Sequence, residues 1–323
     1  RTKDQPDPQP TVAYALTRET HQSDLAVGSQ TKIQHSFSYS DGFGREIQKK
    51  IQAEPGPVEE GGPIVSPRWV GSGWTVFNNK GKPVRQFEPY FSTAHGFEFD
   101  VRVGVSPILF YDPLQRVVAT LNPNHTWQKT VFDPWRQETW DVNDTLLLNP
   151  VEELDVADYF RRLNQDEYLP TWYSARISGV VGVQEQAAAQ KTEAHANTPA
   201  VVHMDSLGRA FLTFAHNRVS RNGGAIADEF YRTSIVYDIE GNQREVIDAK
   251  DRVVMRYDYD MLGTPIHSAS MDAGERWMLN NVAGQPLRAW DARGHEFRTE
   301  YDQLHRPVSQ FVRGTDASES DPR

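Results

Sequence analysis

Aspartates are the residues whose type and spacing first point to chemistry in this sequence. Carboxylates held in pairs can act as general acid and base, and carboxylates gathered in a loop can bind Ca²⁺. Five aspartates stand in short, similar phrases: Asp41, Asp205, Asp238, Asp260 and Asp302. Their regular spacing places them on successive turns, where hydrogen bonds to the backbone are sufficient to explain them. We therefore expect a structural role for these carboxylates.

Other polar residues offer weaker candidates. His195, His203 and Asp205 can be read as a metal cluster, but they lack the helical spacing of ligands and bracket a helix end and a strand start. Three serines lie near glycines without a nucleophile-elbow phrase: Ser66, Ser72 and Ser206. Gly223-Gly224 is an isolated pair rather than a phosphate-binding loop. We expect no catalytic, metal or cofactor site, and we expect that the chain is not an enzyme.

Tryptophans could also form a platform for sugar rings. The chain has eight of them: Trp69, Trp74, Trp127, Trp135, Trp140, Trp172, Trp277 and Trp290. Most flank predicted strands or turns, where large rings pack into a core or line a shell. We favour packing over sugar binding.

The aspartates are positioned by an internal repeat between residues 234 and 312. One phrase recurs there in four copies: Tyr237-Asp238-Ile239-Glu240-Gly241, Tyr259-Asp260-Met261-Leu262-Gly263, Asn280-Asn281-Val282-Ala283-Gly284 and Tyr301-Asp302-Gln303-Leu304-His305. The acidic or amide position falls at 238, 260, 281 and 302, so that the steps are 22, 21 and 21 residues. A fixed period indicates a repeat architecture.

Each phrase has the chemistry of a tight β-turn. Asp or Asn at the first position accepts hydrogen bonds from the backbone ahead of it, and Gly three residues later takes the left-handed conformation of a bulged hairpin. We assign structural turn positions to these residues: Asp41, Gly44, Asp112, Asp133, Asp205, Gly208, Asp238, Gly241, Asp260, Gly263, Asn281, Gly284 and Asp302. In the phrases at Asp112 and Asp133 the Gly is lost and Pro occupies the second turn position.

The segments between the turns alternate as strands do. Val253, Met255, Tyr257 and Tyr259 fall on one face of the predicted strand before Asp260. Secondary turns at 248–251 and 291–294 lie about midway between the main ones, as the other ends of the hairpins would. The sequence predicts an all-β protein, a hairpin array in a curved sheet. A strand is predicted around 32–39, and strand character returns at 69–77.

Residues 146–199 interrupt the strand pattern. Asn149-Pro150-Val151-Glu152 predicts a helix start, because Asn caps, Pro suits the first position and Glu the third. An apolar residue then recurs every three positions: Val151, Leu154, Ala157, Phe160 and Leu163. Residues 184–196 are rich in Ala, Gln and Glu and predict a second helix that ends at Asn197. This segment is expected to be a helical insertion.

Composition limits the class of protein. The 323 residues carry a net charge of −10, with 24% charged and 11% aromatic residues, as in globular proteins. The acidic balance argues against a nucleic-acid partner. No apolar run is long enough for a membrane span. There is no cysteine, so no disulfide or thiolate site is available.

The predicted organisation has five parts. A polar tail occupies residues 1–10, a degenerate hairpin strip 11–145, the helical insertion 146–199, a second hairpin strip 200–313 and a polar tail 314–323. Because the sequence begins Arg1-Thr2-Lys3 with neither an initiator Met nor a signal peptide, we expect a piece of a longer polypeptide.

The repeated phrases resemble those of the YD-repeat or Rhs proteins. The Tyr-Asp-x-x-Gly phrases at 237 and 259, and Asp-x-x-Gly-Arg at 41 and 205, carry this likeness, while Asn280 and His305 depart from it. More narrowly, three stretches resemble the B component of the bacterial insecticidal Tc toxin complexes: Pro170-Thr171-Trp172-Tyr173, Ala194-His195-Ala196-Asn197-Thr198-Pro199 and His203-Met204-Asp205-Ser206-Leu207-Gly208-Arg209. The resemblance covers most of residues 32–313.

The resemblance implies a function. In that family the repeats wind a sheet into a hollow shell, closed with a C component, that encloses a toxic C-terminal segment. The expected role is a structural segment of such a shell in a secreted toxin complex, with the rest of the polypeptide and a C-component-like chain as partners. The docking propeller of the B component and the aspartyl self-cleavage motif of the C component have no counterpart here. The alternatives are a cell-surface adhesion or carbohydrate-binding module and, with no candidate residues, a carbohydrate-active enzyme.

Overall fold

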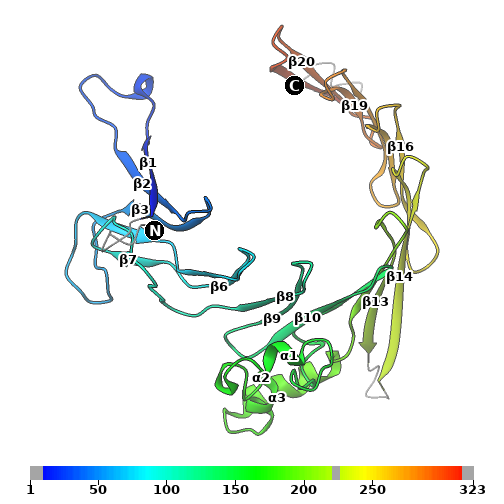
Figure 1. Ribbon diagram of the computed structural model, residues 1–323. Coiled ribbons are helices and arrows are strands. Elements are labelled where there is room, and N and C mark those ends of the chain that lie inside the picture. Colours follow the sequence, from blue (N-terminus) through cyan, green and yellow to red (C-terminus); the bar gives the residue numbers. More distant parts are fainter. Residues whose placement is uncertain (1–9, 220–225, 315–323) are drawn as a thin grey trace. The chain divides into compact units, whose positions relative to one another are not determined.

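The structure, a computed structural model, describes residues 10–219 and 226–314. Nearly all of the two predicted polar tails therefore lies outside the described residues. The chain forms two compact units. Unit 1 comprises Arg1–Lys129 and Leu148–Gln186, and unit 2 comprises Thr130–Leu147 and Ala187–Arg323. The all-β prediction is confirmed, because strands dominate both units and the helices are few and short (Figure 1).

Unit 1 contains two groups of paired strands. The first has the order β1-β2-β3-β4-β7 and the bounds Thr11–Arg18, Ile33–Ser40, Glu46–Ala53, Arg68–Gly71 and Tyr90–Ser92. The second has the order β10-β9-β8-β6-β5, with β5 at Thr75–Phe77, β6 at Pro83–Gln86, β8 at Ile108–Tyr111, β9 at Val117–Leu121 and β10 at Trp127–Phe132, of which residues 127–129 belong to unit 1. The strand β1, which the sequence did not predict, pairs antiparallel with β2 over its whole length.

Residues 69–77, where the sequence predicts strand character, form two strands rather than one continuous strand. The segment is broken between β4 and β5, which belong to the two different groups. The cause is a close backbone approach at Gly73, where an added Cβ would overlap the carbonyl oxygen of Phe87. Such crossings admit only Gly, because every other residue carries a Cβ.

Unit 1 holds a compact apolar core under its second strand group. Phe110 of β8, Leu121 of β9 and Trp127 of β10 pack around Phe160, whose side chain is fully buried. The rings of Trp127 and Phe160 meet edge to face with centroids 5.4 Å apart. Tyr168 makes a second such contact with Phe160 at 5.8 Å. These contacts tie the helical segment to the strands.

The helical segment starts later than the sequence predicts. Asn149 and Glu152 form a turn, and the first helix, α1, covers only Ala157–Phe160. Leu154 of the predicted apolar stripe is fully exposed. A spacing of exactly three residues drifts around a helix of 3.6 residues per turn, so the stripe cannot stay on one face. The other helices are α2 at Trp172–Ile177 and α3 at Val183–Thr192, with three-residue 3-10 helices at Gln22–Asp24, Gln165–Glu167 and Glu193–His195.

Unit 2 is a curved strip of antiparallel hairpins (Figure 1). From β11 to β21 each strand pairs with the next along the chain. The bounds are Arg136–Trp140, Ala200–Met204, Ala210–Val219, Ala227–Tyr237, Gln243–Ile247, Val253–Tyr259, Pro265–Ser270, Gly274–Asn280, Pro286–Trp290, Glu296–Tyr301 and Pro307–Arg313.

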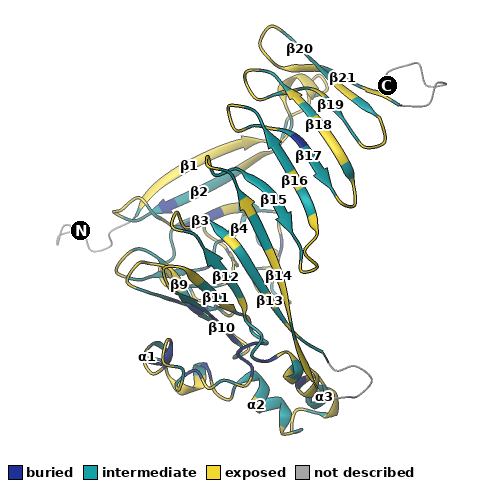
Figure 2. Ribbon diagram, turned by 90° about the vertical axis from the view of Figure 1, so that its right-hand side faces the viewer, coloured by how far each residue is buried: buried dark blue, intermediate teal, exposed yellow. Residues whose placement is uncertain are grey.

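The strip of unit 2 is a single layer. In β11 to β21, all of which is described, the only buried residue is His267 of β17. The remaining strand residues are partly or fully exposed (Figure 2). Hydrogen bonds and neighbouring side chains on the same face therefore hold this strip together, in place of a core between two layers.

Candidate functional site

The repeated turns are the most regular feature of the chain, and the turn at Asp260 represents them. The Asp260 Oδ1 atom accepts hydrogen bonds from the backbone N–H groups of Leu262 and Thr264 at 2.8 and 2.9 Å. The Gly263 N–H donates to the Asp260 carbonyl oxygen at 3.1 Å. Gly263 has a φ of 76°, and the strand register shifts at Asp258/Tyr259. This is a bulged hairpin turn with the aspartate at its first position.

The same arrangement recurs at most of the assigned turn positions. A side-chain oxygen accepts from the N–H groups two and four residues ahead in the turns that start at Asp41, Asn78, Asp205, Asp238, Asp248, Asn281, Asp291 and Asp302. Four turns keep the left-handed position without Gly, since Gln115, His125, Asp251 and His305 have φ values of 66°, 63°, 58° and 57°. The turn at Asp133 is one residue shorter and bonds Asp133 N–H to the Arg136 carbonyl at 2.9 Å.

In several turns the arginine four residues after the aspartate donates a side-chain hydrogen bond to its carboxylate. Arg209 donates from Nε to Asp205 Oδ2 at 2.8 Å, and Arg306 donates in the same way to Asp302 at 2.7 Å. Further pairs of this kind are Arg45 with Asp41, Arg116 with Asp112 and Arg252 with Asp248. The hydrogen bonds from the backbone and side chain of Arg209 lower the pKa of Asp205.

The tyrosine before the aspartate links each turn to the preceding one. The hydroxyl of Tyr259 donates to the carbonyl oxygen of Gln243 at 2.9 Å, and Tyr301 donates to Pro286 at 2.9 Å. In each case the acceptor lies five residues after the Asp or Asn that starts the preceding turn on the same edge of the strands. Tyr237 with Ala210 and Tyr111 with Pro83 follow the same rule, at 2.9 and 2.8 Å.

The arginine of one turn also contacts the aromatic ring of the next. The Arg209 guanidinium lies 4.8 Å from the centroid of the Tyr237 ring, and Arg45 lies 4.7 Å from that of Phe77. Asp, Arg and Tyr therefore form a ladder along one edge of the strands, which we call the Tyr-Asp edge. In unit 2 the ladder is interrupted at Phe132, Met204 and Asn280, which stand in the tyrosine position without a phenol hydroxyl, as Phe77 does in unit 1.

Sequence reasoning missed the roles of the tyrosine and the arginine in this ladder. Packing alone does not require a hydroxyl, so the recurrence of Tyr rather than Phe before the turn was the available signal. The acceptor lies on a neighbouring hairpin, and its identity depends on the strand register.

The one buried residue of the unit 2 strands belongs to a polar cluster. His267 Nδ1 lies 2.8 Å from Asp258 Oδ2, and Arg244 donates to Asp258 Oδ1 at 2.6 Å. The His267 ring stacks on Trp277 with centroids 4.0 Å apart. The hydrogen bond from His267, supported by the charge of Arg244, lowers the pKa of Asp258. His267 Nε2 is buried and has no partner among the described residues.

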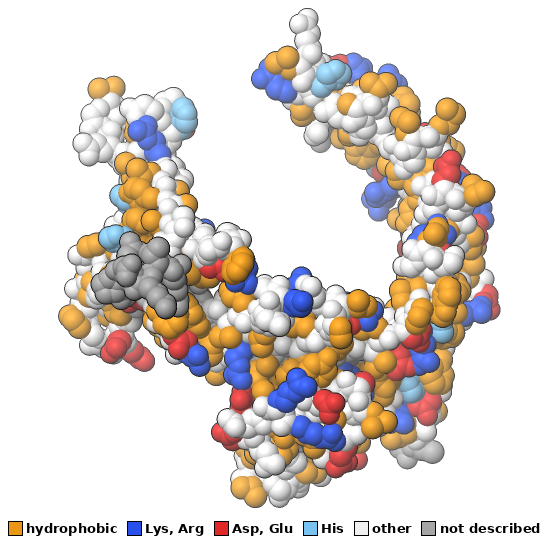
Figure 3. All heavy atoms as spheres, in the orientation of Figure 1, with side chains coloured by type: hydrophobic (Ala, Val, Ile, Leu, Met, Phe, Trp, Pro, Cys, Tyr) orange, Lys and Arg blue, Asp and Glu red, His pale blue; other side chains and the backbone are white. Residues whose placement is uncertain are grey.

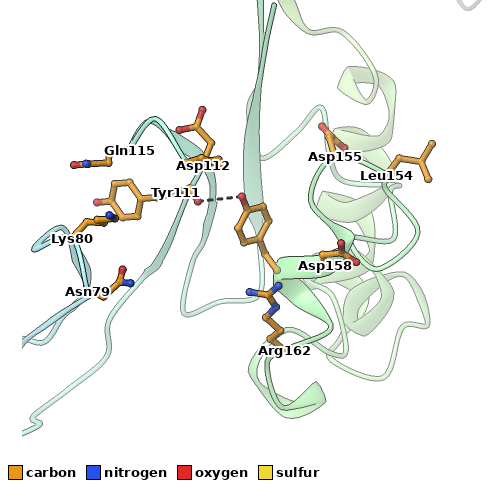
Figure 4. Close-up of a pocket in the computed structure, with 11 residues that line it drawn as sticks. Asn79, Lys80, Tyr111, Asp112, Gln115, Leu154, Asp155, Asp158 and Arg162 are labelled. Carbon is orange, nitrogen blue, oxygen red and sulfur yellow. Dashed lines mark hydrogen bonds between the residues drawn. The ribbon is translucent and has the colours of Figure 1, made fainter.

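A polar cavity of about 490 Å³ lies within unit 1 (Figure 4). Asn79, Lys80 and Asp112 line it from two turns, and Asp158 and Arg162 line it from the helical segment. The Tyr159 hydroxyl donates to the Tyr111 carbonyl at 3.1 Å across this region.

The carboxylates that line this cavity have cationic partners. Asp112 pairs with Arg116 at 2.7 Å, and Asp155 pairs with Lys129 at 3.1 Å. Neither a histidine nor a serine is among the lining residues.

The predicted metal candidates do not come together as ligands. His203 of β12 meets the Phe214 ring edge to face, at 5.8 Å between centroids, and Asp205 pairs with Arg209. The described residues contain no group of three or more His, Asp or Glu side chains that could hold a metal ion.

The serine and tryptophan candidates are dispersed. Ser72 Oγ accepts from the Lys49 N–H at 2.8 Å. Trp69 and Trp127 are buried in unit 1, whereas Trp135 and Trp277 in unit 2 are about half exposed.

Comparison with solved structures identifies the fold. The chain aligns with the TcdB2-TccC3 crystal structure over 98% of its length, at a TM-score of 0.65 and 23% identity. A TcdB2-TccC3-Cdc42 structure aligns over 99% at 0.66 and 22%, and a Tc holotoxin pore of Photorhabdus luminescens over 98% at 0.64 and 22%. This chain has the fold of those Tc toxin chains. The resemblance to a Tc toxin B component is thereby confirmed at the level of the fold.

The match covers a small part of the Tc toxin chains. This chain spans 14% of the length of each of the three solved chains. No protein-family model and no curated protein matched it. Among the described residues, no helix is long and apolar enough to cross a membrane.

Proposed function

We propose that this chain is a structural segment of a β-shell that encloses a toxic polypeptide in a Tc-type toxin complex. The observation that carries the proposal is the alignment of 98% of the chain with TcdB2-TccC3. The single-layer strip of unit 2 supports it, because a wall needs a large hydrogen-bonded area and no core of its own. The complex would be secreted.

The chemistry of the turns supports a role without catalysis. The turn carboxylates accept backbone hydrogen bonds, and several also pair with the arginine four residues ahead. A carboxylate used in this way is held ionised and is not poised to move protons at neutral pH.

The partners would be the rest of the polypeptide and a C-component-like chain. In unit 2 the strand order ends at β21, whose outer edge has no neighbour among the described strands. An open edge presents backbone N–H and C=O groups that another strand can pair with. We propose that such partners cover this edge in the assembled shell.

The experiment is co-expression with a C-component-like partner that carries its cargo. We expect a soluble complex in which the cargo resists protease, and we expect the chain alone to self-associate in light scattering. A matched control is the partner expressed without this chain, whose cargo should be digested. A clean monomer that does not combine with the partner, or cargo that stays digestible, would contradict the proposal. Binding to a sugar array by that monomer would favour the adhesion module.

A further inference from the structure

The turns of the Tyr-Asp edge in unit 2 all carry an exposed apolar side chain at their tips. The tip positions are the two residues after the Asp or Asn that starts each turn. The apolar tips are Trp135, Leu207, Ile239, Met261, Leu262, Val282 and Leu304, whose exposures range from 57% to 102%. We call this set the tip row. Every one of the six turns on this edge contributes to it.

The opposite edge of the same strip has a different composition. Its described turns carry the tips Ala249-Lys250, Asp272-Ala273 and Ala292-Arg293, which are small or charged. Met271 is the one large exposed apolar residue in these described turns, and residues 220–225, between β13 and β14 in the sequence, lie outside the described residues. Tight hairpin turns therefore do not require apolar tips, so the tip row needs another explanation.

The tip row is regular in space as well as in sequence. Adjacent strands lie about 4.8 Å apart, so turns on one edge recur about every 10 Å, and six turns extend over about 50 Å. Apolar side chains reach the surface along unit 2 in Figure 3. Exposed apolar side chains that line up over such a length form a surface that a partner with the same spacing could cover.

The occupant must follow both the spacing and the curvature of the strip. Strands in a sheet rotate by about 20–25° from one to the next, and the strip of unit 2 is visibly curved (Figure 1). A straight helix can follow the 10 Å repeat of the tips over two or three hairpin turns, and beyond them it departs from the curved row. A second hairpin strip has the same spacing and the same twist, so its tips can stay in register along the whole row.

The energetics and the charge of the edge suit a strip-to-strip contact. Burying seven such side chains removes about 600 Å² per strip, close to the about 800 Å² per partner of a specific interface. Tips of two strips offset by one strand spacing, about 5 Å, would interdigitate. The Asp205–Arg209 and Asp302–Arg306 pairs neutralise charge beside the tips, which limits repulsion between two such edges.

We propose that the tip row is the contact surface for a second hairpin strip of the same repeat type, bound turn edge to turn edge. The contact uses side chains rather than the open backbone of β21, and it does not require cargo. A second copy of this chain supplies such a strip, so self-association of the chain is the direct probe.

The test compares three variants by analytical ultracentrifugation at increasing concentration. The first replaces four tips with serine: Leu207→Ser, Ile239→Ser, Met261→Ser and Val282→Ser. The second places lysines on the outer strand, Val308→Lys and Val312→Lys, which blocks edge pairing. The third, Met271→Ser, alters an exposed apolar residue of the opposite edge. Because all these side chains are exposed, the unfolding midpoints should stay close to that of the parent chain.

We expect the dissociation constant of self-association to rise by about two orders of magnitude in the tip variant, because four buried apolar contacts are lost. The Met271→Ser variant should match the parent, and the lysine variant should retain contact through the tips. A monomeric parent, an unaffected tip variant, or an equal loss in the lysine and tip variants would overturn the proposal. Failure to form a complex with a C-component-like partner would instead count against the shell function alone.

Discussion

The hydroxyl of Tyr237 donates a hydrogen bond of 2.9 Å to the backbone carbonyl oxygen of Ala210. These residues lie on different hairpins, and Ala210 immediately follows the Arg209 whose guanidinium lies over the Tyr237 ring. One tyrosine thus contacts the preceding turn through both its ring and its hydroxyl. This relationship explains why a tyrosine precedes the aspartate in the repeated phrase.

The first prediction concerns the hydroxyl links of this ladder. Tyr259→Phe removes the bond to Gln243 and should lower the free energy of unfolding by about 0.5–1.5 kcal/mol. Tyr257→Phe is the matched control, because the described structure gives the Tyr257 hydroxyl no hydrogen bond. Denaturant titration of both variants measures the difference. Equal effects would show that the hydroxyl link carries no stability.

The second prediction restores a missing link. Asn280 occupies the tyrosine position opposite Pro286, as Tyr259 does opposite Pro265. By the rule of the ladder, Asn280→Tyr places a hydroxyl near the Pro265 carbonyl and should raise the free energy of unfolding by up to about 1 kcal/mol. Asn280→Phe adds the ring without the hydroxyl and separates the two contributions. A stabilisation equal in both variants would assign it to the ring.

The third prediction concerns the left-handed turn positions. Gly263→Val forces a β-branched residue to a φ of 76° and should cost about 2 kcal/mol or more. Asp260→Ala loses side-chain bonds to the backbone, at about 0.5–1.5 kcal/mol. His305→Gly, at a φ of 57°, should have the opposite sign, because it relieves a left-handed non-Gly residue. The denaturation midpoints should be highest for His305→Gly, lower for Asp260→Ala and lowest for Gly263→Val. Another order would contradict this assignment of the turns.

The fourth prediction separates buried from exposed ion pairs in unit 1. The Lys50 ammonium is fully buried against the Glu98 carboxylate, and its Nζ lies 4.7 Å from the centroid of the Tyr90 ring. Lys50→Ala should destabilise by about 1–3 kcal/mol, because it removes the buried cationic partner of Glu98, whose carboxylate is partly exposed and keeps its hydrogen bonds from Tyr90 and Ser92. Changing Lys32, in an exposed pair with Glu54, to Ala should have little effect on the unfolding midpoint, because solvent screens this pair. Similar losses in the two variants would refute the distinction.

The fifth prediction concerns acid. Hydrogen bonds from the Arg252 side chain and backbone lower the pKa of Asp248 to about 2, and Arg306 lowers the pKa of Asp302. Carboxylates with a depressed folded-state pKa bind fewer protons than in the unfolded chain. Their stabilisation is therefore present above the ordinary pKa of about 4 and is lost as the pH falls towards 2. Unfolding midpoints measured between these limits should fall with pH, and Asp248→Asn should reduce the slope. A flat profile would contradict the shift.

Several elements were predictable from the sequence because their causes are local. An Asp or Asn followed by Gly after three residues dictates a bulged turn through its own backbone bonds, and the 21-residue period dictates that such turns recur. The second helix was predictable from the Ala- and Gln-rich run that forms α3, Val183–Thr192. The helix expected at Asn149 failed because a local cap signal was not followed by an apolar pattern of helical period.

The sequence by itself determined the hairpin array, the turn chemistry and the absence of cysteine chemistry, because these depend on residues a few positions apart. Tertiary structure alone decided which carbonyl each tyrosine reaches, that Gly73 separates β4 from β5, and that Lys50 is buried. It also placed the apolar tips on one edge of the strip. These features depend on strand register and on contacts between residues distant in sequence, which no local pattern specifies.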